Sequence, residues 1–152
     1  MSAHGLSHAD WAVRAAAYRG FVERLEAPSL EELAAALDAS VDAVLASLER
    51  LEEAHQIALL PDRSGLWMAS PFSAVPTDFP VETLRGRCWA NCAWDAFGVP
   101  AILGIDGWTE TRCAASGERL SFGVEGGRRV GGEGLVHLAV PPRDAWVDIG
   151  FT

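Results

Sequence analysis

The chain has 152 residues, 49% of them hydrophobic, which is enough for one ordinary domain or two small ones with a real core. Its formal net charge of -9 repels nucleic acid and anionic membrane surfaces, because phosphate binding needs clusters of lysine and arginine. No secretion signal and no membrane-spanning run is visible, and the three cysteines form no CxxC pair, so we expect a cytoplasmic protein with reduced thiols.

The first 70 residues have the pattern of three helices followed by a β-hairpin. We predict that residues 1–9 are loose. After them, apolar residues recur at spacings of three and four, which predicts a helix, and Asp10 can cap its start. Ser29 and Glu32 make a capping box for the second helix, and Ser40 can cap the third. The predicted elements are a helix from Asp10 to before Pro28, helices over 29–37 and 40–51, and strands over 56–60 and 66–69.

Three helices and a hairpin are typical of a winged-helix-like module, which usually reads DNA with its third helix. That helix is acidic here, and the hairpin turn offers only Arg63 as a cation. The charged residues of the third helix are Asp42, Glu49, Arg50, Glu52 and Glu53. Four carboxylates against one guanidinium argue against DNA binding. The alternative interpretation is a helical unit, over residues 1–70, that serves as packing material or as a lid.

The second half of the chain changes to a β pattern. Residues 71–86 contain three prolines and a glycine, and we predict an irregular connector. The remaining stretch, 87–152, is predicted to hold a helix around Cys92 and a mixed or antiparallel sheet with strands over 108–113, 119–125 and 135–140. The last residues, 145–152, read as an element cut short, so we expect a truncated domain. The fold class is therefore α+β.

The stretch Arg87–Gly104, RCWANCAWDAFGVPAILG, holds most of the residues that could carry chemistry. In a helix, Cys92 and Asp95 are i,i+3 neighbours, and Cys88 shares their face if the helix reaches back that far. Gly98 and Pro100 can end one helix and start another. The aromatic residues that would wall the pair are Trp89, Trp94 and Phe97.

Each polar residue of this stretch has two interpretations. Cys92 is either an inert buried thiol or a thiolate nucleophile or soft-metal ligand activated by a helix N-terminus. Asp95 either bonds local backbone or acts as a proton donor whose pKa is raised by apolar neighbours. Cys88 and Cys113 are interpreted as structural. The four histidines are scattered without zinc-ligand spacing.

The motif NCAWDAFGVPAILG, followed some twenty residues later by RCAASGERL, resembles the alkylmercury lyases. The resemblance runs from about Asp10 to Thr152 and implies cleavage of carbon–mercury bonds without a cofactor. It implies that Cys92 is a catalytic thiolate, that Asp95 is the proton shuttle and that Cys113 is structural. An apolar wall of Trp89, Trp94 and Phe97 would hold the organic group. The implied partners are an organomercurial substrate and small thiols as co-reactants.

One departure from the family pattern concerns the second mercury-binding cysteine. In the family it follows the region matched by 145–152, and this sequence ends there. We therefore expect either a fragment or a homologue without that thiol. Cys88 is the weak candidate for a substitute mercury ligand, because two cysteines four apart on a helix could reach one metal. The rival hypotheses are a mercurial-binding protein without catalysis and a winged-helix regulator.

Overall fold

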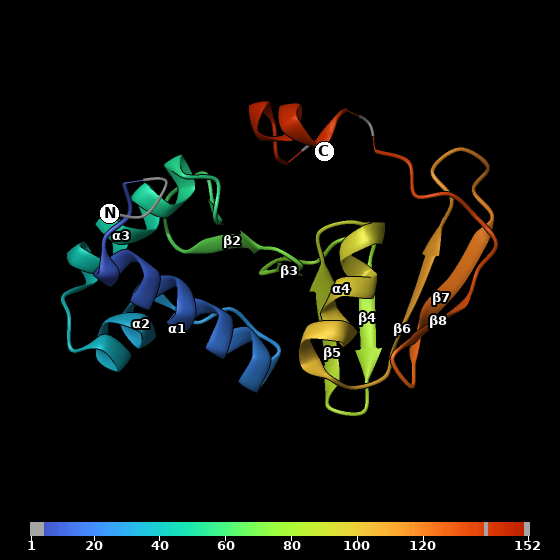
Figure 1. Ribbon diagram of the computed structural model, residues 1–152, viewed down its shortest axis with the longest axis horizontal. Helices are drawn as coiled ribbons and strands as arrows, with labels where there is room; N and C mark the ends of the chain where they lie inside the picture. The colour runs from blue at the N-terminus through green and yellow to red at the C-terminus, as the bar shows by residue number, and fades with distance from the viewer. Residues whose placement is uncertain (1–4, 139, 151–152) are drawn as a thin grey trace.

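A computed structural model describes residues 5–138 and 140–150, and its fold is α+β (Figure 1). The helices are α1 (His8–Arg24), α2 (Leu30–Leu37), α3 (Val41–Glu53), α4 (Ala93–Leu103) and the 3-10 helix η1 (Pro142–Val147). The strands are β1 (Ala58–Leu59), β2 (Leu66–Ala69), β3 (Phe72–Ser73), β4 (Pro80–Thr83), β5 (Gly86–Ala90), β6 (Gly107–Arg112), β7 (Arg119–Glu125) and β8 (Arg128–Gly131). Helices α1, α2 and α3 pack on one another at one end of the molecule.

The three N-terminal helices begin at serine caps. Ser29 and Glu32 form the predicted capping box of α2, and Ser40 caps α3 through the N–H of Ala43. The prediction for α1 was wrong at its start. Ser7 is the N-cap and Asp10 is the third helical residue of a second capping box, so the helix begins inside the segment expected to be loose.

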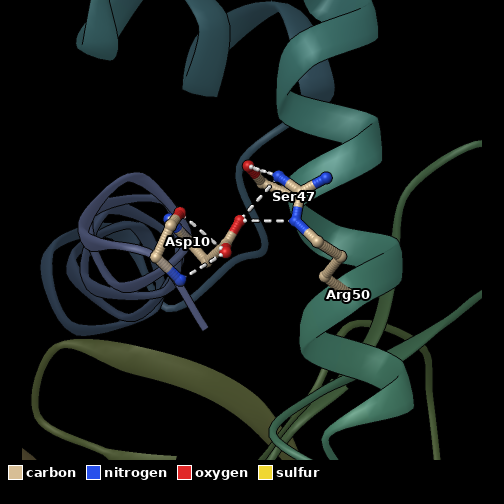
Figure 2. Close-up of polar contacts among 4 residues, drawn as sticks. Asp10, Ser47 and Arg50 are labelled. Atoms are coloured by element: carbon tan, nitrogen blue, oxygen red, sulfur yellow. Dashed lines mark hydrogen bonds and ion pairs between the residues drawn. The ribbon is translucent and has the colours of Figure 1, made fainter. Parts of the chain in front are cut away.

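Asp10 also connects α1 to α3 (Figure 2). Its carboxylate is 1% exposed, and Oδ1 accepts hydrogen bonds from Arg50 Nε and Nη2 at 3.1 and 2.7 Å. Arg50 Nη2 also donates to Ser47 Oγ at 3.0 Å, while Asp10 Oδ2 accepts from the Ser7 N–H and hydroxyl. Every lone pair of this buried carboxylate therefore has a donor nearby, as burial of a charge requires.

All strands belong to one antiparallel sheet in the order β1-β2-β3-β5-β4-β6-β7-β8. The irregular connector predicted over 71–86 is wrong, because β3 and β4 lie inside it. β3 pairs with β2 on one side and β5 on the other, so the sheet runs from the N-terminal hairpin into the second half without a break. Pro80 is tolerated at the first position of β4, where a missing N–H costs least.

The C-terminal third departs from the sequence prediction. The strand expected over 135–140 is wrong, since 132–138 form no strand and β8, which ends at Gly131, is the last strand of the described residues. Leu135 is 97% exposed, so its apolar character does not reflect burial. The chain then returns to the N-terminal helices, where Trp146 of η1 stacks on His55 with ring centroids 4.6 Å apart. Part of the predicted final element, 151–152, lies outside the described residues.

A single hydrophobic core passes from the helices to the sheet. Phe21 of α1 stacks on Phe72 of β3 with centroids 5.1 Å apart, which joins the N-terminal helices to the sheet by apolar burial. α4 packs on β4, β5, β6 and β7 through the buried residues Ala96 and Val99. This packing fixes the position of the helix that carries Cys92 at its start.

Candidate active site

Cys92 and Asp95 lie together at the N-terminus of α4. Cys92 is the N-cap, with an extended backbone at φ −151° and ψ 178°, and Asp95 is the third helical residue. The predicted break at Gly98 and Pro100 is wrong, because α4 continues to Leu103 and ends at Gly104 with φ 66°. Gly107, which has no side chain, leaves room for the Pro100 ring, since a Cβ there would lie 2.7 Å from Pro100 Cγ.

The thiol of Cys92 and the carboxyl of Asp95 interact. Burial raises the pKa of Cys92, the N–H groups of Asp95 and Trp94 act to lower it, and the charge of Asp95 adds to the rise. Burial also raises the pKa of Asp95, against hydrogen bonds from Asn91 and Cys92 that lower it. Both groups are half-buried. A thiol and a carboxyl with raised pKa values are suited to exchange a proton.

Asn91 completes this group, although no sequence pattern predicted a role for it. Its Nδ2 donates to Asp95 Oδ2 at 3.1 Å and to Ser70 Oγ at 3.4 Å, and its N–H donates to the Pro71 carbonyl at 3.3 Å. Tyr18 of α1 donates to the Ser70 carbonyl at 2.8 Å. Burial raises the pKa of Tyr18, Arg14 opposes this rise and the charge of Asp95 adds to it, so α1 lies near the site.

The predicted aromatic wall is divided between two pockets. Trp94 and Phe97 line an apolar cavity of about 510 Å³ between α4, β7 and residues 132–136. Trp89 lies instead on a more polar pocket of about 740 Å³, together with Asp78, Arg112 and Arg119. Neither Cys92 nor Asp95 lines either pocket. The three aromatic residues therefore do not form one wall, and the apolar cavity reaches α4 through Ala93, Trp94, Phe97 and Gly98.

Cys88 does not share a helix with Cys92. It belongs to β5, pairs with Val81 of β4 and is 2% exposed, with its sulfur 4.0 Å from the Val81 carbonyl oxygen. Burial raises the pKa of this thiol to about 11. The premise that placed Cys88 one helical turn from Cys92 is therefore wrong, because the strand ends at Ala90 and the helix begins only at Ala93.

Cys113 lies in the turn between β6 and β7. Its N–H donates to the Glu118 carbonyl at 2.9 Å, and its carbonyl accepts from the Gly117 N–H at 2.8 Å. Hydrogen bonds from the Ser116 hydroxyl and N–H and from the Ala115 N–H lower the pKa of its thiol. The turn is closed by backbone bonds rather than by the sulfur. The structural role expected for Cys113 stays a prediction.

No three His, Cys, Asp or Glu side chains are grouped as ligands of a metal ion in residues 5–138 and 140–150. A helix with the length and hydropathy needed to cross a bilayer is not found among the elements described above. Cys92 and Cys113 are both half-buried thiols, and Cys92 is the one that interacts with Asp95.

The sequence model of the alkylmercury lyase family, MerB, matches residues 72–151. That range begins at β3 and includes Cys92, Asp95 and Cys113. A crystal structure of the mercury-bound form of MerB2 matches with a TM-score of 0.66 at 19% sequence identity. The match covers 83% of this chain and 60% of that chain, so this chain spans less than two thirds of the solved protein. No curated protein sequence matches.

Proposed function

The chain belongs to the alkylmercury lyase family, and from this premise we propose that it cleaves carbon–mercury bonds with Cys92 as thiolate and Asp95 as proton shuttle. The observation that carries the proposal is the contact of a half-buried thiol with a carboxyl group at the start of α4. This pair lies inside the range matched by the family. The substrate is an organomercurial, R–Hg⁺, delivered as its complex with a small thiol.

Capture of mercury is the first step of the proposal. Mercury is a soft cation, and thiolate is the protein ligand that soft metals prefer. Asp95 accepts the proton of the Cys92 thiol, and the resulting thiolate displaces the small thiolate from R–Hg. The N-terminus of α4 supports the thiolate, because the N–H groups of Trp94 and Asp95 favour its charge.

Protonolysis is the second step. The proton held by Asp95 passes to the carbon bonded to mercury, the carbon–mercury bond breaks, and its electron pair forms the new C–H bond of R–H. Hg²⁺ remains on the Cys92 sulfur, and thiolates of the small co-reactant fill its other positions. Burial of Asp95 supports this role, because a carboxyl with a raised pKa retains a proton to donate closer to neutral pH.

The other parts of the molecule have supporting roles in this proposal. The apolar cavity lined by Trp94 and Phe97 adjoins the start of α4 and offers space for apolar groups near the site. Residues 1–70, which we propose as a winged-helix-like unit, contribute Tyr18 next to the site. We assign Cys113 a structural role in its turn.

The direct test adds phenylmercury or methylmercury with excess small thiol and measures benzene or methane. We expect product in the parent chain and only the thiol background in Cys92→Ser and Asp95→Asn. Cys113→Ser is the matched control, since it removes a more exposed thiol that lies outside the site. Stoichiometric, Cys92-dependent capture of mercury without hydrocarbon would instead identify a binding protein. A Cys92→Ser chain that releases product as fast as the parent would falsify the proposed enzyme.

A further inference from the structure

We propose that Asn91 is a positioning residue that occupies Oδ2 of Asp95 and thereby leaves Oδ1 to receive and deliver the proton. This inference rests on the proposed function of Cys92 and Asp95. It concerns a residue that touches Asp95 but neither the mercury nor the departing carbon. Its basis is the hydrogen-bond geometry around a single side-chain amide.

Both donor positions of the Asn91 amide are in use. Nδ2 donates to Asp95 Oδ2 at 3.1 Å and to Ser70 Oγ at 3.4 Å. Asn91 Oδ1 is buried and has no hydrogen-bond partner among the described residues. The opposite orientation of the amide would place this carbonyl oxygen against a carboxylate that offers only acceptors. The two donated bonds therefore determine how the amide is oriented.

The backbone of Asn91 is held independently of its side chain. Its N–H donates to the Pro71 carbonyl at 3.3 Å, and the next carbonyl along the helix start, that of Cys92, accepts from the Ala96 N–H at 3.0 Å. Ser70 is in turn fixed from α1, because Tyr18 donates to its carbonyl at 2.8 Å. The amide is thus anchored to segments far away in sequence, which prevents it from following Asp95 when that side chain rotates.

The consequence for the reaction follows from carboxyl chemistry. A carboxyl oxygen that accepts an N–H donor is the poorer site for a proton, because the donor and the proton compete for the same oxygen. With Oδ2 occupied, the proton from the Cys92 thiol adds to Oδ1, and the same oxygen then protonates the carbon as the carbon–mercury bond breaks. Without Asn91, the proton has two competing positions and the carboxyl rotates more freely, so fewer encounters are productive.

The kinetic test separates capture from protonolysis. The variants are Asn91→Leu, which keeps the size of the side chain, and Ser70→Ala, which removes only the longer of the two contacts. All chains carry Cys113→Ser, so that the more reactive turn thiol does not take up the mercurial. Each chain is loaded with one equivalent of phenylmercury, capture is followed by loss of the Cys92 thiol, and benzene release is followed in a single turnover. We expect Asn91→Leu to capture fully and to release benzene about 10–100-fold more slowly, the range for outer-shell residues that orient a reacting group. Ser70→Ala should stay within about threefold of the parent chain.

A spectroscopic test does not depend on turnover. Asn91 is the only asparagine in the sequence, so labelling with ¹⁵N-asparagine gives a single side-chain NH₂ group in the NMR spectrum. We expect one Nδ2 proton to lie downfield of a free amide and to move upfield in Asp95→Ala. Two Nδ2 protons at free-amide positions in the parent chain would overturn the positioning role, whatever the enzyme does.

The two tests also distinguish this inference from the proposed function. If the parent chain releases no benzene, the lyase proposal fails while the NMR result still decides whether Asn91 holds Asp95. If benzene is released and Asn91→Leu releases it as fast as the parent, the positioning role is wrong and the lyase proposal stands. Equal loss of capture and release in Asn91→Leu would mean a damaged fold, and it would also contradict the role.

Discussion

Asp10 and Arg50 join α1 to α3 through one carboxylate oxygen, which accepts from Nε at 3.1 Å and from Nη2 at 2.7 Å. Asp10 is buried while Arg50 is half exposed, with side-chain exposures of 1% and 49%. If the guanidinium is removed, the buried carboxylate of Asp10 loses two hydrogen-bond donors that water cannot easily replace. The guanidinium of Arg50, by contrast, is accessible to water.

We expect Arg50→Met to lower the free energy of unfolding by roughly 1–3 kcal/mol at neutral pH. The matched control is Arg24→Met, which breaks an exposed ion pair with Glu32 and should cost below about 0.5 kcal/mol. Urea unfolding of the three chains measures both values. Equal effects at the two positions would contradict the assigned role of the buried carboxylate.

The same ion pair predicts a pH dependence. Burial raises the pKa of Asp10, but hydrogen bonds from Arg50 and Ser7 outweigh it and hold the pKa below its usual value. A lowered folded-state pKa stabilises the fold above the unfolded value of about 4, and this contribution is lost as the pH falls through the folded-state value. The gap in unfolding free energy between the parent and Arg50→Met should therefore narrow as the pH falls below about 4. A gap that stays constant down to acid pH would contradict this linkage.

The three thiols are expected to react in a fixed order with iodoacetamide near neutral pH. Cys113 should react first, because hydrogen bonds from Ser116 and Ala115 lower its pKa and its turn is open to solvent. Cys92 should follow, and Cys88 should be last because its pKa is about 11 and it is 2% exposed. Peptide mass spectrometry at timed intervals gives the order. Early labelling of Cys88 in the folded chain would show that β5 is not buried as described.

Asp95→Asn should make the thiol of Cys92 more acidic. The negative charge of Asp95 and its acceptance of the thiol proton both raise the pKa of Cys92, and a neutral amide removes the charge while the helix N–H groups stay. The midpoint of the pH profile for alkylation of Cys92 should move to lower pH. The profile is measured with Cys113 changed to serine, so that the more reactive turn thiol does not interfere. A midpoint that does not move would show that the two side chains are uncoupled.

Gly123 is expected to tolerate no side chain. A Cβ on this residue of β7 would lie 2.2 Å from the backbone oxygen of Gly107 on β6, and backbone cannot move aside as a flexible side chain can. Gly123→Ala should lower the free energy of unfolding by about 1–3 kcal/mol. Gly134→Ala, where a Cβ meets nothing within 4 Å, is the control and should be near neutral. Thermal unfolding of both variants tests the β6–β7 register, which a neutral Gly123→Ala would contradict.

Local sequence signals predicted the first half of the fold well. Periodic apolar residues and serine caps located α2 and α3, because both signals act within a few residues. The start of α1 was misplaced although Ser7 and Asp10 carry the spacing of a capping box. Asp10 serves two partners, and the more distant one, Arg50, could not be inferred from local spacing.

Tertiary contacts explain the errors in the second half. An apolar run predicted a strand over 135–140, but Leu135 is exposed, and Leu135 and Val136 line one side of the cavity at Trp94 and Phe97. The sequence pointed to Cys92 and Asp95 because a short helical spacing joins them. Asn91 carried no comparable signal, since its role depends on Ser70, which lies 21 positions away and is brought close only by the pairing of β3 with β5.

The double pairing of β3 has a consequence for any attempt to divide the protein. A cut between Ala69 and Phe72 would separate β2 from β3 and leave each fragment with a strand edge that has lost its hydrogen-bond partner. Exposed strand edges of this kind pair with strands of other chains and cause aggregation. The N-terminal helices and the half of the chain that carries Cys92 therefore share one sheet, and division at that junction would expose an aggregation-prone strand edge on each piece.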